Sequence, residues 1–316
     1  MEPAARIAAV VVHHETPDRT LRCARSLLAS GLPVDGIVIV DNGSRDGSRE
    51  AIGREIPGAT LVRSERNLGF AGGANLGIES ALAAGAELVL LLNSDARVEP
   101  HCLERLEAAL RGDPALGIVG PAILSDAEPE QALSLGLSLS SKSGRFREHR
   151  SRSGPRKPAG DDRVDALSGC AMLIRRELLE RVGFFDETYF FGFEDVELCQ
   201  RARGAGFGCE LVADAVVRHE GHATVGRGSP ARLYYAARNH LRLVRTLRAA
   251  GWTHMALRQA AVVCFNLAHA LKGDEIARLP GLRAVLLGCL DHARRRYGPA
   301  PVSRKRVARA ASRTRA

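Results

Sequence analysis

The sequence lacks several patterns that would assign it to common protein classes. Its seven cysteines form no CxxC pair, which argues against a zinc ribbon or a disulfide framework. No GxGxxG follows the first strand-like segment and no GxxxxGK[ST] occurs, so dinucleotide dehydrogenases and P-loop enzymes are disfavoured. No apolar stretch reaches about 18 residues, and the N-terminal apolar run is too short for a signal peptide. We therefore expect a cytoplasmic chain that does not span a membrane.

Acidic residues are missing from the C-terminal end. From Arg294 onward the chain carries nine Lys or Arg and no Asp or Glu, which accounts for most of the net charge of +9. We interpret residues 294–316 as a disordered basic tail suited to an anionic membrane surface. A solvated end without a partner explains the composition equally well. No nucleic-acid partner is expected.

Strand-like and helix-like segments alternate through the first half of the chain. This order predicts βαβ units, and hence an α/β, Rossmann-like, doubly wound and mainly parallel sheet. The run ELVLLLN is continuous and apolar, as expected of a strand buried on both faces. The expected strands are 7–12, 36–41, 59–64 and 87–93, and the expected helices are 18–30, 48–56, 75–84 and 100–111.

The second half has a different texture. Four leucines at period two, from Leu133 to Leu139, predict an exposed strand, and the basic segment 143–162 predicts a mobile loop. Helices are expected over 173–182 and 194–204, both closed by glycine. After Ser229 come helical patterns whose apolar faces are interrupted by Arg and His. They form a C-terminal helical extension that either packs on the domain or lies on a bilayer.

Polar residues follow three of the strand-like segments. In doubly wound sheets the ligand binds outside the carboxyl ends of the strands, where this chain places Thr16, Asp41, Asn42, Asn93 and Asp95. Asp41 is suited to accept hydrogen bonds from a ribose or a base edge, and Asp95 to hold a metal that meets a diphosphate. A plain turn explains DNGSRDGS almost as well, and an acid after a strand is often only a helix N-cap.

The segment RNLGFAGGANLGI adds weight to a binding site. Gly72 and its neighbouring glycines allow a backbone to approach a ligand closely, and Asn67 and Asn75 offer uncharged hydrogen-bonding groups.

A further carboxylate pair occurs in FFDETYFFGFEDVELCQ. Burial of Asp195 and Glu194 against the preceding aromatics would raise a carboxyl pKa, whereas the helix start favours the anion. A carboxylate held between these influences suits a general base, although an acidic first helical turn is the simpler explanation of the motif alone. His219 gains interest only beside these motifs, and His222 is interpreted as structural.

Taken together, seven ordered motifs resemble the family 2 glycosyltransferases, inverting enzymes of the GT-A fold, and most of all their rhamnosyltransferase-like branch. The resemblance covers residues 6–245. The motifs are VVVHHETPDRTLRCARSLL, IVIVDNGSRDGS, RNLGFAGGANLGI, LLLNSDA, LSGCAMLIRRELLERVGFFDE, FFGFEDVELCQRARGAG and YYAARNHLRLV.

The resemblance implies roles for particular residues. Asp41 would hold the nucleoside of an activated sugar, with the backbone around Thr16 lining the same pocket. Asp95 matches the last acid of a DxD-type motif whose first position is Asn93, and His219 would complete the site for Mg²⁺ or Mn²⁺. Asp195 matches the base that deprotonates the acceptor hydroxyl, with Glu194 beside it.

The sequence also departs from the family pattern. The residues HHE at 13–15 replace an Asn-Tyr-Asn found in many relatives, so nucleotide contacts at this point are left open. With one acid in NSD, we expect weak metal affinity in the absence of substrate.

We therefore expect a metal-dependent inverting glycosyltransferase that moves a sugar from a dTDP- or UDP-sugar to a glycan or lipid-linked acceptor. The branch points to rhamnose from dTDP-rhamnose. Two alternatives are a non-catalytic nucleotide-sugar binding protein and a nucleotidyltransferase. The expected location is the cytoplasm, with peripheral attachment at the inner face of the plasma membrane.

The expected organisation has three parts. Residues 1–228 form the catalytic domain, with a nucleotide-sugar half over 1–123 and an acceptor half over 124–228. Residues 229–293 form a helical region, followed by the basic tail.

Overall fold

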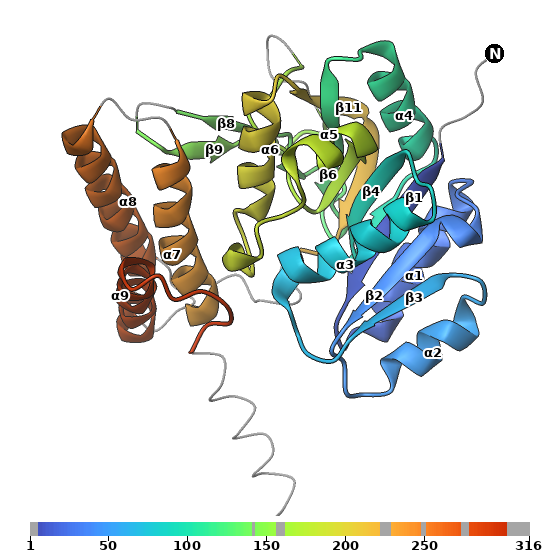
Figure 1. Ribbon diagram of the computed structural model, residues 1–316, viewed down its shortest axis with the longest axis horizontal. Coiled ribbons are helices and arrows are strands. Elements are labelled where there is room, and N and C mark those ends of the chain that lie inside the picture. Colours follow the sequence, from blue (N-terminus) through green and yellow to red (C-terminus); the bar gives the residue numbers. More distant parts are fainter. Residues whose placement is uncertain are drawn as a thin grey trace, which may run out of the picture. The chain divides into compact units, whose positions relative to one another are not determined.

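The computed structural model describes residues 6–140, 143–155, 162–221, 229–247, 251–272 and 278–301. It divides into two compact units, each described by itself. The first contains residues 1–139, 146–186 and 194–221, and the second contains 140–145, 187–193 and 222–316. Figure 1 shows the elements of both.

A nine-stranded mixed sheet forms the first unit. Its order is β3-β2-β1-β4-β10-β6-β11-β5, with β7 paired to β6 and a separate pair formed by β8 and β9. Strands β1, β2, β3 and β4 are parallel neighbours, whereas β10 runs antiparallel between β4 and β6. The strands are β1 (Ile7–His13), β2 (Ile37–Asn42), β3 (Thr60–Ser64), β4 (Leu88–Asn93), β5 (Ala96–Val98), β6 (Leu116–Ser125), β7 (Ala132–Ser134), β8 (Leu137–Leu139), β9 (Phe146–Glu148), β10 (Ala171–Arg175) and β11 (Gly208–His219).

Helices cover both faces of this sheet, as the doubly wound pattern predicts. Residues from α1, α2 and α4 share one buried cluster with alternate residues of β1, β2 and β4, whereas α3 packs on the opposite face. Both faces of each of these strands are therefore shielded from solvent, which explains their continuous apolar runs. The helices of this unit are α1 (Pro17–Ala29), α2 (Ser48–Glu55), α3 (Gly69–Ala83), α4 (Cys102–Gly112), α5 (Arg176–Val182) and α6 (Glu194–Gly204).

Three expectations about local structure were wrong. The helix expected from Asn75 begins at Gly69, so the glycine-rich segment is helical, and its glycines let α3 lie close to the sheet. The first part of the expected helix 173–182 is strand β10, because a short apolar run is enough for a strand buried between β4 and β6. The leucine repeat breaks at Gly136 into β7 and β8, with Leu135 and Leu137 buried.

The segment that we expected to be a mobile loop contains β9, which pairs with β8. Residues 156–161 of it, and His222, lie outside the described residues.

The second unit contains the three helices expected after Ser229, namely α7 (Pro230–Thr246), α8 (Trp252–Lys272) and α9 (Arg278–Ala293). Helix α7 begins with Ser229, whose hydroxyl accepts a hydrogen bond from the Arg232 amide, and Pro230 occupies the first helical position. No described helix is long and apolar enough to cross a membrane.

Two fully buried residues of α7 hold the inserted segment 187–193 of this unit. The Arg238 guanidinium donates to the Tyr189 carbonyl at 2.9 Å, and the Asn239 carboxamide lies 2.8–2.9 Å from the carbonyls of Tyr189, Phe191 and Gly192. A buried cation is costly unless its donors are satisfied, and here carbonyls and aromatic faces satisfy it. The motif YYAARN is therefore a clamp on this segment.

The clamped segment has an unusual backbone. Phe190 and Phe193 adopt left-handed conformations, with φ of 61° and 78°. Such conformations are costly for bulky residues and persist only where surrounding contacts fix them. Phe190 stacks on Tyr235 and Phe193 on His240. The sequence motif thus determines the conformation of the residues that precede Glu194.

We predict that Gly77→Ala destabilises the first unit. A Cβ at Gly77 would lie 2.9 Å from a methyl of Val40 and still closer to Val10. We expect a loss of about 1–3 kcal/mol in unfolding free energy, measured by urea denaturation. The control is Gly112→Ala at the end of α4, where a Cβ meets nothing within 4 Å. Equal stability of the two variants would contradict this account of α3 packing.

Candidate active site

Asp41 lies at the carboxyl end of β2, directly beside His13 of β1. Its side chain is almost fully buried and accepts a hydrogen bond of 3.0 Å from the Ser44 amide. The turn formers after Asp41 therefore cap one of its oxygens, as expected of an Asp at a turn. The other carboxylate oxygen is the group with which Asp41 would meet a ligand.

His13 is a structural residue. Its two ring nitrogens lie 2.8 Å from the Thr20 hydroxyl and 2.7 Å from the Ser48 hydroxyl. Burial lowers the pKa of His13, so the ring is neutral and ties the end of β1 to α1 and α2. Thr16 follows as the N-cap position of α1, where its carbonyl accepts from the Thr20 amide.

Asn42 and Asn67 shape the connection from β3 to α3. The Asn42 carboxamide accepts from the Leu68 amide at 2.9 Å and donates to the Gly69 carbonyl at 2.8 Å. Asn67 accepts from the Gly69 amide at 2.8 Å. Both side chains thus fix the turn that starts α3.

Two other expected binding residues lie within α3. Gly72 is buried in its first turns, and the Asn75 carboxamide both donates to and accepts from the backbone of Phe185, at 2.9 and 3.0 Å. These contacts give Asn75 a structural task that its sequence position did not reveal.

Asp95 and His219 meet although they are far apart in sequence. Strand β11 ends at His219, which pairs with Ala96 of β5, and the imidazole Nε2 lies 3.1 Å from Asp95 Oδ1. Both side chains are largely buried. Burial alone would raise the pKa of Asp95, but its hydrogen bond to His219 and the charge of that ring lower it overall. Burial would lower the pKa of His219, but Cys170 and Asp95 raise it. Overall the pKa of His219 is raised to about 11 and that of Asp95 is lowered, which favours an ion pair between the two side chains.

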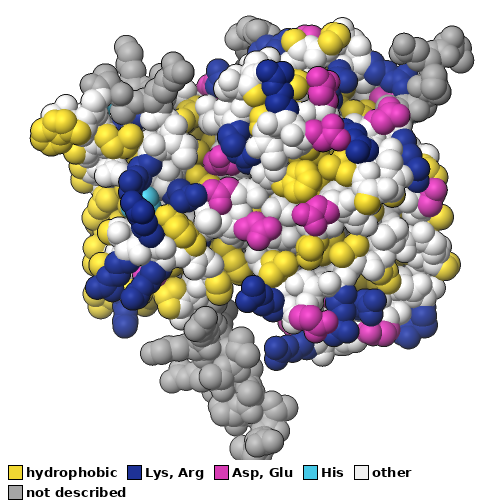
Figure 2. Space-filling view, viewed as in Figure 1, with side chains coloured by type: hydrophobic (Ala, Val, Ile, Leu, Met, Phe, Trp, Pro, Cys, Tyr) yellow, Lys and Arg dark blue, Asp and Glu magenta, His cyan; other side chains and the backbone are white. Residues whose placement is uncertain are grey.

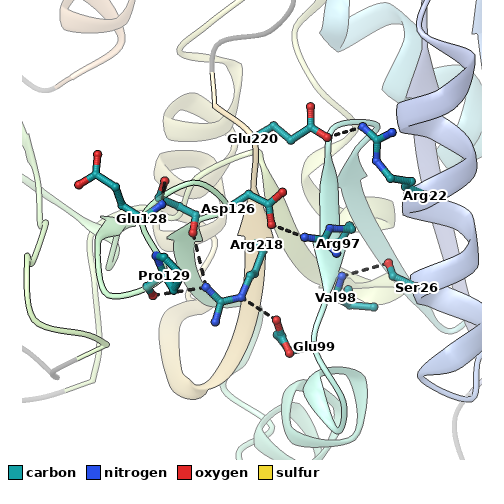
Figure 3. A network of polar contacts seen from close by, with 11 residues as sticks. Arg22, Ser26, Arg97, Val98, Glu99, Asp126, Glu128, Pro129, Arg218 and Glu220 are labelled. Carbon is teal, nitrogen blue, oxygen red and sulfur yellow. Dashed lines mark hydrogen bonds and ion pairs between the residues drawn. The ribbon is translucent and has the colours of Figure 1, made fainter.

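A polar network holds the strands that carry this pair (Figure 3). Arg97 of β5 pairs with Asp126 after β6, and Arg218 of β11 pairs with Glu99 at 2.7 Å. The Val98 amide donates to Ser26 of α1 at 3.1 Å, and Glu220 forms ion pairs with Arg19 and Arg22 of the same helix. Exposed ion pairs contribute little singly, but a network fixes the geometry of β5 and β11.

Asp195 is held by backbone amides in the first turn of α6. Its carboxylate accepts 2.8 Å hydrogen bonds from the amides of Gly169 and Val196. A Cβ at Gly169 would be in tight contact with Asp195, 3.2 Å from its Cβ. Gly169 was not among the expected site residues, because part of strand β10, which follows it, was expected to be helical. The motif SGC was the available signal.

Opposing influences act on the pKa of Asp195. Burial raises it, the two backbone hydrogen bonds lower it, and Glu148 raises it further, with a raised pKa as the result. A buried carboxylate with an elevated pKa and a fixed orientation is the kind of group that accepts a proton near neutral pH.

The hydrogen-bonding register brings Asp41, Asn93 and Asp195 to the carboxyl ends of the parallel strands, which form one edge of the sheet. Asp41 faces His13, and the preceding Val12 faces Asn93 of β4. The Asn93 amide donates to the Cys170 carbonyl at 2.9 Å, and the amide of the adjacent Gly169 donates to Asp195. With about 4.8 Å between strands, Asp41 lies roughly 10 Å from β4, and Asp195 lies on its other side.

The Asp95–His219 pair can hold a divalent metal, although it supplies few ligands. No group of three or more His, Cys, Asp or Glu side chains suited to a metal occurs among the described residues. One carboxylate and one imidazole in contact suit a cation that completes its coordination with diphosphate oxygens and water. The residues therefore fit a metal that binds together with its substrate.

The sheet and its two layers of helices define an α/β protein of the class that binds ligands at the carboxyl ends of the strands, where Asp41 and Asp95 lie. Comparison with known families then gives the assignment. The glycosyl transferase family 2 model matches residues 8–183, more than half of the chain. The chain belongs to this family, and the expectation of a family 2 hexosyltransferase is confirmed.

Characterised relatives are similar over most of the chain. An N-acetylglucosaminyl-diphospho-decaprenol L-rhamnosyltransferase of Mycobacterium tuberculosis is 30% identical over 251 residues, covering 73% of this chain and 80% of the relative. A dTDP-rhamnosyl transferase, RfbF, of Shigella flexneri is 24% identical over 268 residues, covering 80% of this chain and 88% of the relative. The chain is thus rhamnosyltransferase-like, as the motifs indicated.

Solved structures confirm the GT-A fold. GalNAc-T7 with UDP, GalNAc and Mn²⁺ matches 93% of this chain and 55% of its own, with a TM-score of 0.62 and 18% identity. The mannosyltransferase PcManGT of Pyrobaculum calidifontis, in complex with GDP-Man and Mn²⁺, matches 92% of this chain and 88% of its own, with a TM-score of 0.56 and 16% identity.

We predict that Asp195 lowers the free energy of unfolding increasingly as pH rises. Because its pKa is raised in the folded state, its favourable contribution is complete below the unfolded value of about 3.9 and is lost as pH rises through the folded value. Relative to the parent, Asp195→Asn should therefore gain stability as pH rises from about 4 toward neutrality. Urea denaturation of both proteins across this range measures the difference, in which other titrating groups cancel. A pH-independent difference would contradict the raised pKa.

Proposed function

We propose that this glycosyltransferase inverts the anomeric centre while moving rhamnose from dTDP-rhamnose to a glycan or lipid-linked acceptor. The observation that carries the proposal is the arrangement of Asp41, Asp95 and Asp195 along one sheet edge. The two rhamnosyltransferase relatives support the choice of donor sugar. A UDP-sugar is the alternative donor within the same chemistry.

The proposed donor site uses three groups in order along the edge. Asp41 binds the nucleoside, with the backbone near Thr16 beside it, and Asn93 faces the sugar nucleotide from the end of β4. Asn42, Asn67 and Gly72 shape the pocket through the turn that starts α3. The proposal leaves Asn75 out, because its carboxamide is engaged with Phe185.

Asp95 and His219 are the proposed ligands of Mg²⁺ or Mn²⁺. The bound ion would stabilise the negative charge that grows on the departing nucleoside diphosphate. The contact of 3.1 Å between the two side chains supports this role. To bind a cation, His219 must release the proton that it shares with Asp95 in the ion pair.

Asp195 is the proposed general base. In a single displacement the acceptor hydroxyl loses its proton while its oxygen bonds to the anomeric carbon and the bond to the diphosphate breaks. Hydrogen bonds from Gly169 and Val196 orient the carboxylate, and burial keeps it a better proton acceptor than an exposed Asp. Glu194 precedes it in the buried first turn of α6.

We place the reaction in the cytoplasm at the inner face of the plasma membrane, with the protein bound peripherally. The name of the mycobacterial relative, which acts on a decaprenol-linked sugar, supports a lipid-linked acceptor. The basic composition from Arg294 onward supports contact with anionic lipid. The domain proposal keeps residues 1–228 as the catalytic part, with the segment 145–157 bordering the acceptor.

We predict that Asp195→Asn removes sugar transfer. With Mn²⁺, dTDP-rhamnose and an acceptor present, the rate of dTDP release should fall by roughly 10²–10⁴-fold, the usual contribution of a general base. Binding of dTDP, measured by calorimetry, should be retained as the control. An equal transfer rate in parent and variant would remove the assignment of Asp195.

We predict that metal and nucleotide bind cooperatively. Mn²⁺ alone should raise the melting temperature little, whereas Mn²⁺ with dTDP should raise it clearly, because the diphosphate completes the coordination. In Asp95→Asn this joint shift should disappear, while the metal-independent shift caused by dTDP remains. A joint shift of parental size in Asp95→Asn would place the metal elsewhere.

The same thermal-shift assay tests the two alternative functions. A nucleotidyltransferase should respond more strongly to dTTP or UTP than to the diphosphates. A non-catalytic binding protein should bind a nucleotide sugar and release no diphosphate. Stabilisation by dTDP, together with acceptor-dependent turnover, is the outcome expected of the proposed transferase.

A further inference from the structure

Helix α8 has an inverted distribution of polarity. Its buried stripe, at a spacing of four residues, consists of Arg258, Val262, Asn266 and Ala270, so half of it is polar. Its exposed side carries Leu257 and Phe265 in place of charged residues. A helix of a globular domain normally turns its apolar face inward, because burial of apolar surface drives folding. The outer face of α8 is therefore suited to an apolar environment.

Large hydrophobic side chains are exposed almost only on α8 and α9. Of the eight such residues in the described part of the chain, Leu28 of α1 is the single one elsewhere. Trp252 is 82% exposed, Leu257 71% and Leu279 80%. Figure 2 shows hydrophobic side chains gathered along one side of the helical unit, at the left of the view, with Lys and Arg beside them. The seven residues are Trp252, Leu257, Phe265, Leu271, Leu279, Leu286 and Leu290.

The charges beside these residues are mostly positive: residues 252–301 contain seven Lys or Arg and three acids, two of which, Asp274 and Glu275, lie outside the described residues. In α9 and the residues that follow it, the exposed charged side chains are Arg278, Arg283, Arg294, Arg295 and Arg296. Across residues 252–271 and 278–301 the only acid is Asp291, which accepts a hydrogen bond of 2.8 Å from the Tyr234 hydroxyl. The surface thus combines apolar side chains with exposed cations and no exposed acid in these ranges.

We propose that the exposed face of α8 and α9 is an interfacial docking surface for an anionic lipid bilayer. This inference deepens the proposed function by assigning membrane contact to a particular surface as well as to the basic tail. Arginines bind lipid phosphates while Leu, Phe and Trp enter the boundary between headgroups and acyl chains. The seven residues define the docking face.

Charge complementarity favours a bilayer over a second copy of this chain. A symmetric contact between two copies of the docking face would bring the arginines of both copies together with fewer acids than cations to pair them, and the one described acid, Asp291, already accepts a hydrogen bond from Tyr234. An anionic bilayer instead supplies the missing negative charge, and each basic residue near such a surface adds to the attraction. Apolar contacts and charge therefore both favour binding to an anionic membrane, whereas charge opposes contact between two copies.

The test compares full-length variants that share the same tail. Leu257→Ser/Phe265→Ser removes apolar contacts, and Arg278→Glu/Arg283→Glu reverses two charges. Leu28→Ser is the matched control on α1. Co-sedimentation uses vesicles of phosphatidylglycerol and phosphatidylcholine (1:1), and of phosphatidylcholine alone.

We expect the parent and Leu28→Ser to bind the anionic vesicles equally. Both double variants should bind at least about tenfold more weakly, since each loses two favourable contacts. The charge variant should also show a smaller salt dependence than the parent, and the shared tail accounts for the part that remains. Equal vesicle binding by all four proteins would overturn the proposal. So would a parent that binds no vesicles but forms a dimer in sedimentation velocity that the double variants lose.

Cys264 supplies a second measurement on the same face. It is exposed on α8, whereas five of the other cysteines are buried and Cys289 is partly buried. A polarity-sensitive thiol probe at Cys264 should shift to shorter wavelength when anionic vesicles are added, and an unchanged spectrum would contradict docking. These readouts need no turnover: absent docking with intact transfer would overturn only this inference, and absent transfer with intact docking would overturn only the proposed function.

Discussion

The hydrogen bond from the Gly169 amide to Asp195 is the contact on which the candidate site depends. It joins the turn before β10 to the first turn of α6, and β10 is itself fixed between β4 and β6. Because β10 runs antiparallel to β4, its start lies at the carboxyl end of β4. A residue from the second half of the chain is thereby brought to the edge formed by the first half. A side chain at position 169 would crowd Asp195, whose Cβ would lie 3.2 Å from the added Cβ.

The Asp95–His219 pair is the proposed metal site, and it offers only two protein ligands. Two buried groups of opposite charge satisfy each other without metal, which removes the cost of leaving either charge unpaired in a buried position. Under the proposed function a cation would have to displace that interaction, and the diphosphate would have to contribute much of the binding energy. This coupling would link metal occupancy to the presence of the donor. The network around Arg97 and Arg218 holds the two strands that carry the pair in register.

The second unit shows how one sequence motif can serve backbone geometry. Arg238 and Asn239 use buried donors to hold carbonyls of segment 187–193, and two tyrosines of the same motif pack around the guanidinium. The left-handed Phe190 and Phe193 are accommodated by this clamp. The chain passes from the clamped segment directly into Glu194 and Asp195. Helices α8 and α9 of the same unit expose large apolar side chains beside cationic ones, and contact of the apolar side chains with water is unfavourable.

Periodicity and turn chemistry determined the parallel strands, most of the helices and the edge on which Asp41 and Asp95 lie. These features are local, because a buried strand and an amphipathic helix each leave a pattern within a few residues. Ordered motifs identified the family.

The tertiary structure decided what depends on distant partners. Ala171–Arg175 became a strand because β4 and β6 offered unpaired edges, and Asn75 became structural because Phe185 lies beside it. Likewise, His219 acquired a carboxylate partner 124 residues earlier in the chain. The polarity of α8 was visible as an interrupted apolar pattern, but only packing determined which face was buried. Local sequence specifies propensity, whereas the identity of a buried neighbour follows from the whole fold.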